Sequence, residues 1–156
     1  MKIKQHLLKF WNFWPPFFGA GIKVKSVDSQ WRQMVIELKL RPWTSNYVGT
    51  QFGGSMFAMT DAFYMVMLLR NLGREYIVWD KSATIRYLKP GRTHLRAIFH
   101  LSEDDIMQIK EVLKTQKKMD WTRKVEIKDL NGEVVAEVDK VVYIRKKDDA
   151  PSSPQN

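Results

Sequence analysis

The residues best suited to chemistry lie in a polar loop and in the long apolar segment that follows it. A single carboxylate, Asp61, stands inside that segment, residues 53–71. On a helix, Gly54, Ala58 and Met65 would share its face, and the small residues on its N-terminal side would leave room beside the carboxylate. The plain alternative is a carboxylate on a solvated stripe, but the flanking helical turns carry no polar stripe. Because ionisable groups in apolar surroundings tend to mark sites, we predict that Asp61 acts as a nucleophile or general base.

Two further features surround this carboxylate in the sequence. Gly53 and Gly54 open the predicted helix, where backbone N–H groups have no helical partner. Such donors suit a carbonyl oxygen that becomes an oxyanion, and Gly54 is the better candidate, although a glycine pair can also serve only to join a loop to a helix. Asn46, upstream in the loop, suits either the orientation of a loop or a water molecule, or ordinary turn chemistry.

The whole stretch, Asn46-Tyr47-Val48-Gly49-Thr50-Gln51-Phe52-Gly53-Gly54, resembles the signature of hotdog-fold thioesterases of the PaaI-like, acyl-CoA-hydrolysing kind. That signature reads Asn-x-x-Gly-Thr-x-His-Gly-Gly and is followed, nine positions after the His, by an acidic residue. The resemblance implies that Asp61 attacks the thioester carbonyl or activates the attacking water. It also implies catalytic roles for Asn46 and for the Gly54 N–H.

Phe52 stands where the family has its His, and this is the main departure from the signature. A phenyl ring neither donates nor accepts a hydrogen bond, so either the Gly54 N–H suffices for catalysis or this branch keeps only acyl binding. Gln51 offers an amide that partly replaces the His. We predict substrate contacts from five residues around Asp61: Gln51, Phe52, Gly53, Ala58 and Met65.

A basic cluster follows the long apolar segment. Arg86, Lys89, Arg92 and Arg96 lie on predicted strands and the turn between them, where alternate positions bring side chains together. A solvated face is the plain interpretation. The functional one is a clamp in which Arg86, Lys89 and Arg92 hold the phosphates of coenzyme A or an acidic carrier protein. The strand segment Thr84–Pro90 also resembles the strand that follows the helix in hotdog thioesterases.

Composition narrows the classes of protein. The net charge of +9 and the pI near 9.8 favour an anionic partner without choosing among nucleic acid, membrane, carrier protein and coenzyme A. The absence of cysteine excludes a disulfide framework, a thiolate nucleophile and Cys-ligated metals. His6, His94 and His100 lie far apart without ligand spacing, so we expect no metal and no cofactor beyond the coenzyme A of the substrate. No nucleic-acid-binding module is recognisable.

The hydrophobic pattern predicts one α+β domain over residues 1–147, and its order of strands and helices resembles the hotdog architecture. We expect a capping helix over residues 2–13, whose alternative role is an interfacial anchor, and a continuous helix over residues 53–71 enclosed by a sheet. A capping box at Ser102 predicts an inserted amphipathic helix, and Asn131-Gly132 predicts a type I′ turn. Six antiparallel strands are expected over residues 22–27, 32–40, 77–88, 93–101, 121–130 and 133–145.

The remaining expectations concern context. Residues 148–156 are polar and predicted to be a disordered tail. No signal peptide or transmembrane segment is expected, which makes the cytoplasm the default location. The resemblance implies a homodimer or a tetramer, acting on acyl-CoA or on an acyl carrier protein. The leading interpretation is an acyl-thioester hydrolase; the alternatives are a non-catalytic acyl-thioester or lipid-binding hotdog protein, and a basic interaction protein with anionic partners.

Overall fold

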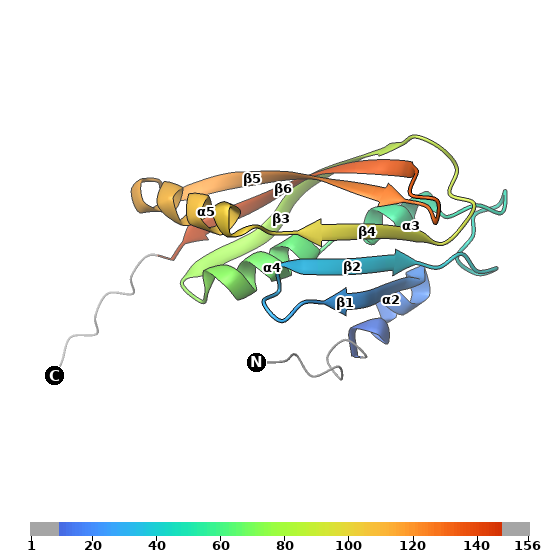
Figure 1. Cartoon of the computed structure of the whole chain (residues 1–156), viewed down its shortest axis with the longest axis horizontal. Coiled ribbons are helices and arrows are strands. Elements are labelled where there is room, and N and C mark those ends of the chain that lie inside the picture. Colours follow the sequence, from blue (N-terminus) through green and yellow to red (C-terminus); the bar gives the residue numbers. More distant parts are fainter. Residues whose placement is uncertain (1–9, 148–156) are drawn as a thin grey trace.

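The computed structural model describes residues 10–147. Six antiparallel strands form one curved sheet in the order β1-β2-β4-β5-β6-β3, with helices α3 and α4 on one of its faces (Figure 1). This is the predicted hotdog architecture. The strands are β1 Ile22–Val27, β2 Gln33–Leu38, β3 Tyr76–Tyr87, β4 Leu95–His100, β5 Lys118–Lys128 and β6 Val134–Lys146.

The strands confirm the predicted hydrophobic pattern, because buried and exposed residues alternate along them. In β2, Met34, Ile36 and Leu38 are fully buried, while Gln33 faces outward. These side chains join those of α4 in a continuous apolar core. Because a one-residue slip would turn the buried side chains of a strand to solvent, the pattern determines the register. The helices that accompany the sheet are α2 Pro15–Ala20, α3 Gly53–Ala58, α4 Phe63–Leu72 and α5 Glu103–Thr115.

Helix α5 confirms the predicted capping box. The Ser102 hydroxyl accepts from the Asp105 N–H at 3.0 Å, and the Asp105 carboxylate accepts from the Ser102 N–H at 3.0 Å. Ile106, Ile109 and Leu113 are buried, so the helix extends the core at one end of the sheet (Figure 1). The cap satisfies two backbone donors that would otherwise lack partners at the helix start.

The predicted continuous helix over residues 53–71 is wrong, because the chain breaks it at residues 59–62. Helix α3 ends at Ala58, and α4 begins only at Phe63. Ala62 adopts a left-handed conformation with φ 64°, which a helix interior cannot contain. The Ala62 N–H donates instead to Oδ2 of Asp80 on β3 at 3.2 Å. A hydrogen bond from a distant strand therefore helps to hold the break.

Helix α2 begins with Pro15 and Pro16, at positions where proline needs no N–H partner. One smaller expectation also differs. The β5–β6 turn is not type I′, because Gly132 has a positive φ whereas Asn131 does not. Asp129 closes this turn by accepting the N–H groups of Asn131 and Glu133. The expected tail lies outside the described residues, as does most of the expected capping helix.

The left-handed Ala62 leads to a prediction about stability. Ala62→Gly should raise the free energy of unfolding by up to about 1 kcal/mol, because glycine adopts positive φ without the Cβ clash. Ala58→Gly is the matched control; it lies in a right-handed helix and should lower stability by about the same amount. Thermal unfolding of both variants checks this. A lower Tm for Ala62→Gly would show that the break carries no relievable strain.

The sheet has two free edges, β1 and β3. Helix α2 lies beside β1, whereas β3, with its 12 residues, pairs with β6 alone within residues 10–147 (Figure 1). A long free edge presents unpaired backbone groups that can pair with another strand. Between residues 10 and 147, no helix has both the length and the apolar character needed to cross a membrane.

Candidate functional site

Asp61 lies in the break between α3 and α4. Its N–H donates to the Ala58 carbonyl at 3.1 Å, which completes the last turn of α3. Its side chain is 67% exposed, so the predicted apolar enclosure of Asp61 is wrong for the single chain. The physical reason is the left-handed Ala62, which interrupts the helix where continuous periodicity would have placed Asp61 on the face of Ala58 and Met65.

A buried lysine contacts this carboxylate. Nζ of Lys140, on β6, lies 3.3 Å from Oδ1 of Asp61 and 3.0 Å from Oδ1 of Asp80. The Lys140 side chain is only 3% exposed, and its neighbours in the buried row of β6 are Val138 and Val142. A buried ammonium is costly unless it is paired, so the two carboxylates stabilise it and it in turn holds them in place.

Asp80 lies immediately before a bulge in β3. Asp80 is opposite Val142 and Ser82 is opposite Val141, so Lys81 is an extra residue in the ladder. The bulge changes which side chains face the core: Asp80 lies on the buried side before it, and Ala83 and Ile85 are the half-buried residues after it. Lys81 points outward and pairs with Asp120 at 2.5 Å.

Sequence reasoning missed Lys140 and Asp80. A signal existed for Lys140, because alternate residues of this strand are apolar and Lys140 stands at one of those positions. No comparable signal existed for Asp80, since apolar and polar residues do not alternate clearly over residues 76–81, and the bulge that follows Asp80 leaves no clear mark in the sequence. Together with Asp61, they form a group that we call the Lys140 cluster: Asp61, Asp80 and Lys140.

Asn46 orders the loop that leads into α3. Its Oδ1 accepts from the N–H groups of Val48 and Thr50, and its Nδ2 donates to Oγ1 of Thr50 at 2.8 Å. The backbone N–H of Asn46 also donates to the Thr50 carbonyl at 2.7 Å. These contacts are the ordinary turn chemistry given above as one alternative for Asn46, and through them the side chain also orients the loop.

Gln51 ties the loop to the sheet. The side chain is 1% exposed, and Nε2 donates to the carbonyls of Leu38 and Thr93 at 3.2 and 3.0 Å. Its backbone N–H donates to the Gly91 carbonyl at 2.8 Å. Both Nε2 hydrogens are therefore used inside the protein, so in this conformation the amide does not offer a donor in place of the missing His.

Each glycine of the pair lies close to an aromatic side chain: Gly53 to Tyr87, and Gly54 to Phe52. The Tyr87 hydroxyl donates to the Gly53 carbonyl at 2.9 Å, and a Cβ on Gly53 would lie 3.0 Å from that hydroxyl. A Cβ on Gly54 would lie 2.5 Å from the Phe52 ring, which is itself 55% exposed. Helix α3 has only six residues, so its first N–H groups, rather than a strong helix dipole, are what it can offer to an anion.

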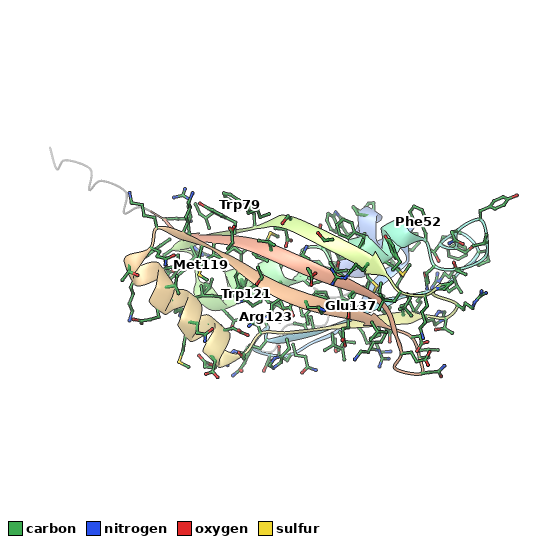
Figure 2. The ribbon with its side chains drawn as sticks, turned by 90° about the horizontal axis from the view of Figure 1, so that it is seen from above. Phe52, Trp79, Met119, Trp121, Arg123 and Glu137 are labelled. Carbon is green, nitrogen blue, oxygen red and sulfur yellow. The ribbon has the colours of Figure 1, made fainter. Side chains whose placement is uncertain are left out.

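Two hollows flank α3. The first, between the loop and the β3–β4 turn, is lined by Gly53, Met56, Tyr87, Lys89 and Arg92, among others. The second, on the side of α2, is lined by Trp43, Phe52, Gly54 and Ala58 together with small polar residues. Figure 2 shows Phe52 near the end of the molecule opposite α5. The predicted substrate-contact residues therefore do not share one hollow: some line the first and some the second, and Met65 packs against the core.

The predicted basic cluster does not come together. Arg86 pairs with Asp139 at 2.7 Å and with Glu137 at 3.3 Å, and Arg96 pairs with Glu37 at 3.0 Å. Hydrogen bonds from Lys124 and Arg86 hold the pKa of Glu137 below its usual range. Lys89 and Arg92 remain beside the first hollow, and Lys89 also pairs with Asp129 and Glu133. The reason is that Arg86 follows the outward alternation of β3, while acidic residues on β6 meet it there.

Two of the three histidines can be placed. His94 and His100 are both exposed, and Nδ1 of His94 accepts from the Leu40 N–H at 3.0 Å. His6 lies outside the described residues. Within residues 10–147, no three side chains of the His, Asp or Glu type gather as metal ligands would.

Comparisons with known proteins identify the family. A family model described as a domain of unknown function (DUF4442) matches residues 4–144. No curated protein matches the sequence. A protein of unknown function from Pseudomonas aeruginosa, PA5026, a probable thioesterase, has a similar structure: TM-score 0.79 and 17% identity over 94% of this chain and 98% of that chain.

Two further solved structures are similar. The Haemophilus influenzae thioesterase HI1161 has TM-score 0.66 and 11% identity over 97% of this chain and 96% of that chain. The Escherichia coli PaaI protein from the phenylacetic acid degradation operon has TM-score 0.60 and 16% identity over 92% of each chain. The chain therefore belongs to the DUF4442 family and has the hotdog fold.

Proposed function

We propose that this protein hydrolyses acyl-thioesters, with Asp61 as the reacting carboxylate. The observation that carries the proposal is the Lys140 cluster, in which a lysine only 3% exposed holds the carboxylate that matches the acidic position of the family signature. A buried cation paired with two carboxylates is costly to build, and such arrangements gather at functional sites. The thioesterase names of proteins with the same fold add support.

The chemistry needs few groups. As a nucleophile, Asp61 attacks the thioester carbonyl, the C–S bond breaks, the thiolate takes a proton, and water cleaves the resulting anhydride. As a base, Asp61 takes a proton from water, the hydroxide attacks the same carbon, the C–S bond breaks, and Asp61 returns the proton to the thiolate. In either case one thioester and one water become one acid and one thiol. The Gly54 N–H donates to the developing oxyanion, and the Phe52 ring beside it keeps water away from that oxygen.

A second protomer completes the site in this proposal. Asp61 is exposed in the single chain. Lys140, which contacts Asp61, lies on β6, and Asp80, which pairs with the same lysine, lies on the free edge strand β3. Pairing of two β3 strands would bring another protomer over this region and would cover part of its exposed apolar surface, such as Phe57 and Leu69. The reaction would then proceed away from bulk water.

We therefore expect a homodimer that forms through β3. Lys81, Ala83 and Ile85 lie along this edge, so replacing Ala83 by Pro should prevent strand pairing and give a monomer with at least tenfold lower kcat/KM. Light scattering over a dilution series, run beside the activity assay, measures both effects. Proline on β1, the other edge, at Lys25 is the matched control. A monomeric parent protein that is fully active would contradict the expectation.

Coenzyme A fits the first hollow best. Arg92 and Lys89 stand beside it and suit phosphate groups, whereas Arg86 is occupied by Asp139 and Glu137. Lys89→Ala combined with Arg92→Ala should raise KM for acyl-CoA about tenfold and leave kcat largely unchanged, since these contacts are remote from the reacting carbon. Arg86→Ala is the control. Equal KM values for the double variant and the parent would mean that the two cations do not contact coenzyme A and are only solvated surface residues.

The proposed activity is tested with a panel of acyl-CoA compounds that spans short, long and aromatic acyl groups. Release of free thiol is followed, and the acid product is identified by mass spectrometry. Turnover of at least one member, lost in Asp61→Asn, supports the proposal. Binding of acyl-CoA without turnover of any member would favour the second candidate, a non-catalytic acyl-thioester-binding protein. The observation in favour of this candidate is Phe52, which can neither donate nor accept at the position of the family His.

A further inference from the structure

A second surface with its own chemistry lies on the far side of α2 from the core. Phe13, Phe18 and Trp43 are 73%, 59% and 64% exposed. They line one hollow with three cations, Lys23, Lys39 and Arg41. We call these six residues the aromatic-basic face. Large apolar patches on a protein surface are unusual without a partner, and aromatic rings are the most costly side chains to leave in water.

Contacts with the core and with β1 hold the aromatic-basic face in place. Phe17 of α2 is buried against Phe63, with ring centroids 5.5 Å apart, so α2 is anchored to the core. The Asn12 side chain accepts from the Val24 N–H at 2.8 Å and donates to the Val24 carbonyl at 3.3 Å. These contacts fix the segment on β1, and the remaining rings are left pointing outward. Figure 1 shows α2 beside β1 at the edge of the sheet.

The cations of this face are not used elsewhere in the part of the chain that the structure describes. Lys23 and Lys39 make no ion pair with any residue from 10 to 147. The Arg41 guanidinium lies over the Trp43 ring, 5.1 Å from its centroid, and also pairs with no acid in that range. By contrast, Lys25 on the same strand pairs with Glu37. The face therefore carries positive charge that no described acid balances.

We propose that the aromatic-basic face docks onto an anionic lipid bilayer. Aromatic rings favour the level of the lipid headgroups, and lysine and arginine beside them favour headgroup phosphates. The net charge of +9 adds a field of the same sign. A second copy of the chain fits less well, because an isologous interface would place the three cations of one copy against those of the other.

Docking would bring the bilayer next to the second hollow beside α3. Trp43 lines both the aromatic-basic face and that hollow, which also contains Phe52, Gly54 and Ala58. An acyl chain that leaves the bilayer would have only a short distance to travel to the residues proposed for hydrolysis. The docking itself does not depend on hydrolysis, so it can be tested with no thioester present.

The experiment is co-sedimentation with vesicles. The full chain is mixed with vesicles of phosphatidylcholine alone or of phosphatidylcholine with phosphatidylglycerol, at low and at high salt. We expect binding only to the anionic vesicles, and weaker binding at high salt. Replacing Lys23, Lys39 and Arg41 together by Ala should weaken partitioning about a hundredfold, at about 1 kcal/mol per cation. Replacing Phe13, Phe18 and Trp43 together by Ala should abolish binding.

The control removes equal charge elsewhere. Lys117, Lys118 and Lys146 line a separate hollow at the far end of the sheet, and their replacement by Ala should leave most of the binding intact. Equal loss in this control and in the basic variant of the face would mean that net charge alone drives binding, which overturns the proposal. No binding to either vesicle would also overturn it. So would self-association in light scattering that only the aromatic variant abolishes, because the face would then be an interface between copies.

Discussion

Asp61→Asn should lower kcat for acyl-thioester hydrolysis by about a hundredfold or more while the fold stays intact. The amide keeps the shape of the carboxylate but is a poor base and nucleophile, and general-base contributions are of this size. The fold should persist because the Asp61 side chain is 67% exposed, and an amide oxygen can still accept from Lys140, now 3.3 Å away. Steady-state thiol release and thermal unfolding, measured on the same preparation, check both parts.

A matched control makes this result specific. Asp120 is also an exposed carboxylate paired with a lysine, Lys81. Asp120→Asn should leave kcat within about twofold, since surface ion pairs contribute little. If both Asn variants hydrolyse as fast as the parent, Asp61 has no chemical role. A large loss of stability in Asp61→Asn would instead show that Asp61 has a structural role.

Lys140→Met should destabilise the protein by about 3 kcal/mol. Methionine fits the apolar row of β6, but it leaves Asp80, only 19% exposed, without its cation. For a chain of this size the loss corresponds to a fall in Tm of roughly 6–12 °C. Chemical denaturation and thermal unfolding measure it.

The reason for this loss can be tested with two further variants. Combining Lys140→Met with Asp80→Asn should recover much of the stability, because the uncompensated charge is removed and the amide oxygen can still accept from the Ala62 N–H. Lys124→Met, at an exposed position on β5, should change stability by less than about 0.5 kcal/mol. An unchanged Tm in Lys140→Met would mean that the ion pairs of the Lys140 cluster do not hold the break between the helices.

Most of the fold could be predicted from local patterns. The alternation of Met34, Ile36 and Leu38 identified a strand with one buried face, and Ser102 with Asp105 identified the start of α5. These signals are local, because side-chain spacing and caps act within a few residues. The expected antiparallel sheet of six strands around a helical segment is confirmed.

The geometry of the site could not be predicted in the same way. The break at Ala62 depends on a hydrogen bond to Asp80, which comes from a strand later in the chain and lies immediately before a bulge. The sequence around Ala62 contains no glycine or proline that would announce a break. The loop was easier, since Asn46 and the glycine pair have strong turn preferences. The prediction of a basic cluster failed because the spacing of charges along the chain does not reveal which acidic residues lie opposite the basic ones in the folded protein.

The most direct test of the proposed hydrolysis measures binding and turnover in one sample. One acyl-CoA from the panel is incubated with an excess of protein, and bound ligand, free thiol and free acid are quantified over time. We predict that the parent releases thiol and acid in equal amounts until the substrate is consumed, and that Asp61→Asn binds the same compound with its thioester intact. Intact thioester bound to the parent protein, with no thiol or acid released, would contradict hydrolysis and identify an acyl-thioester-binding protein.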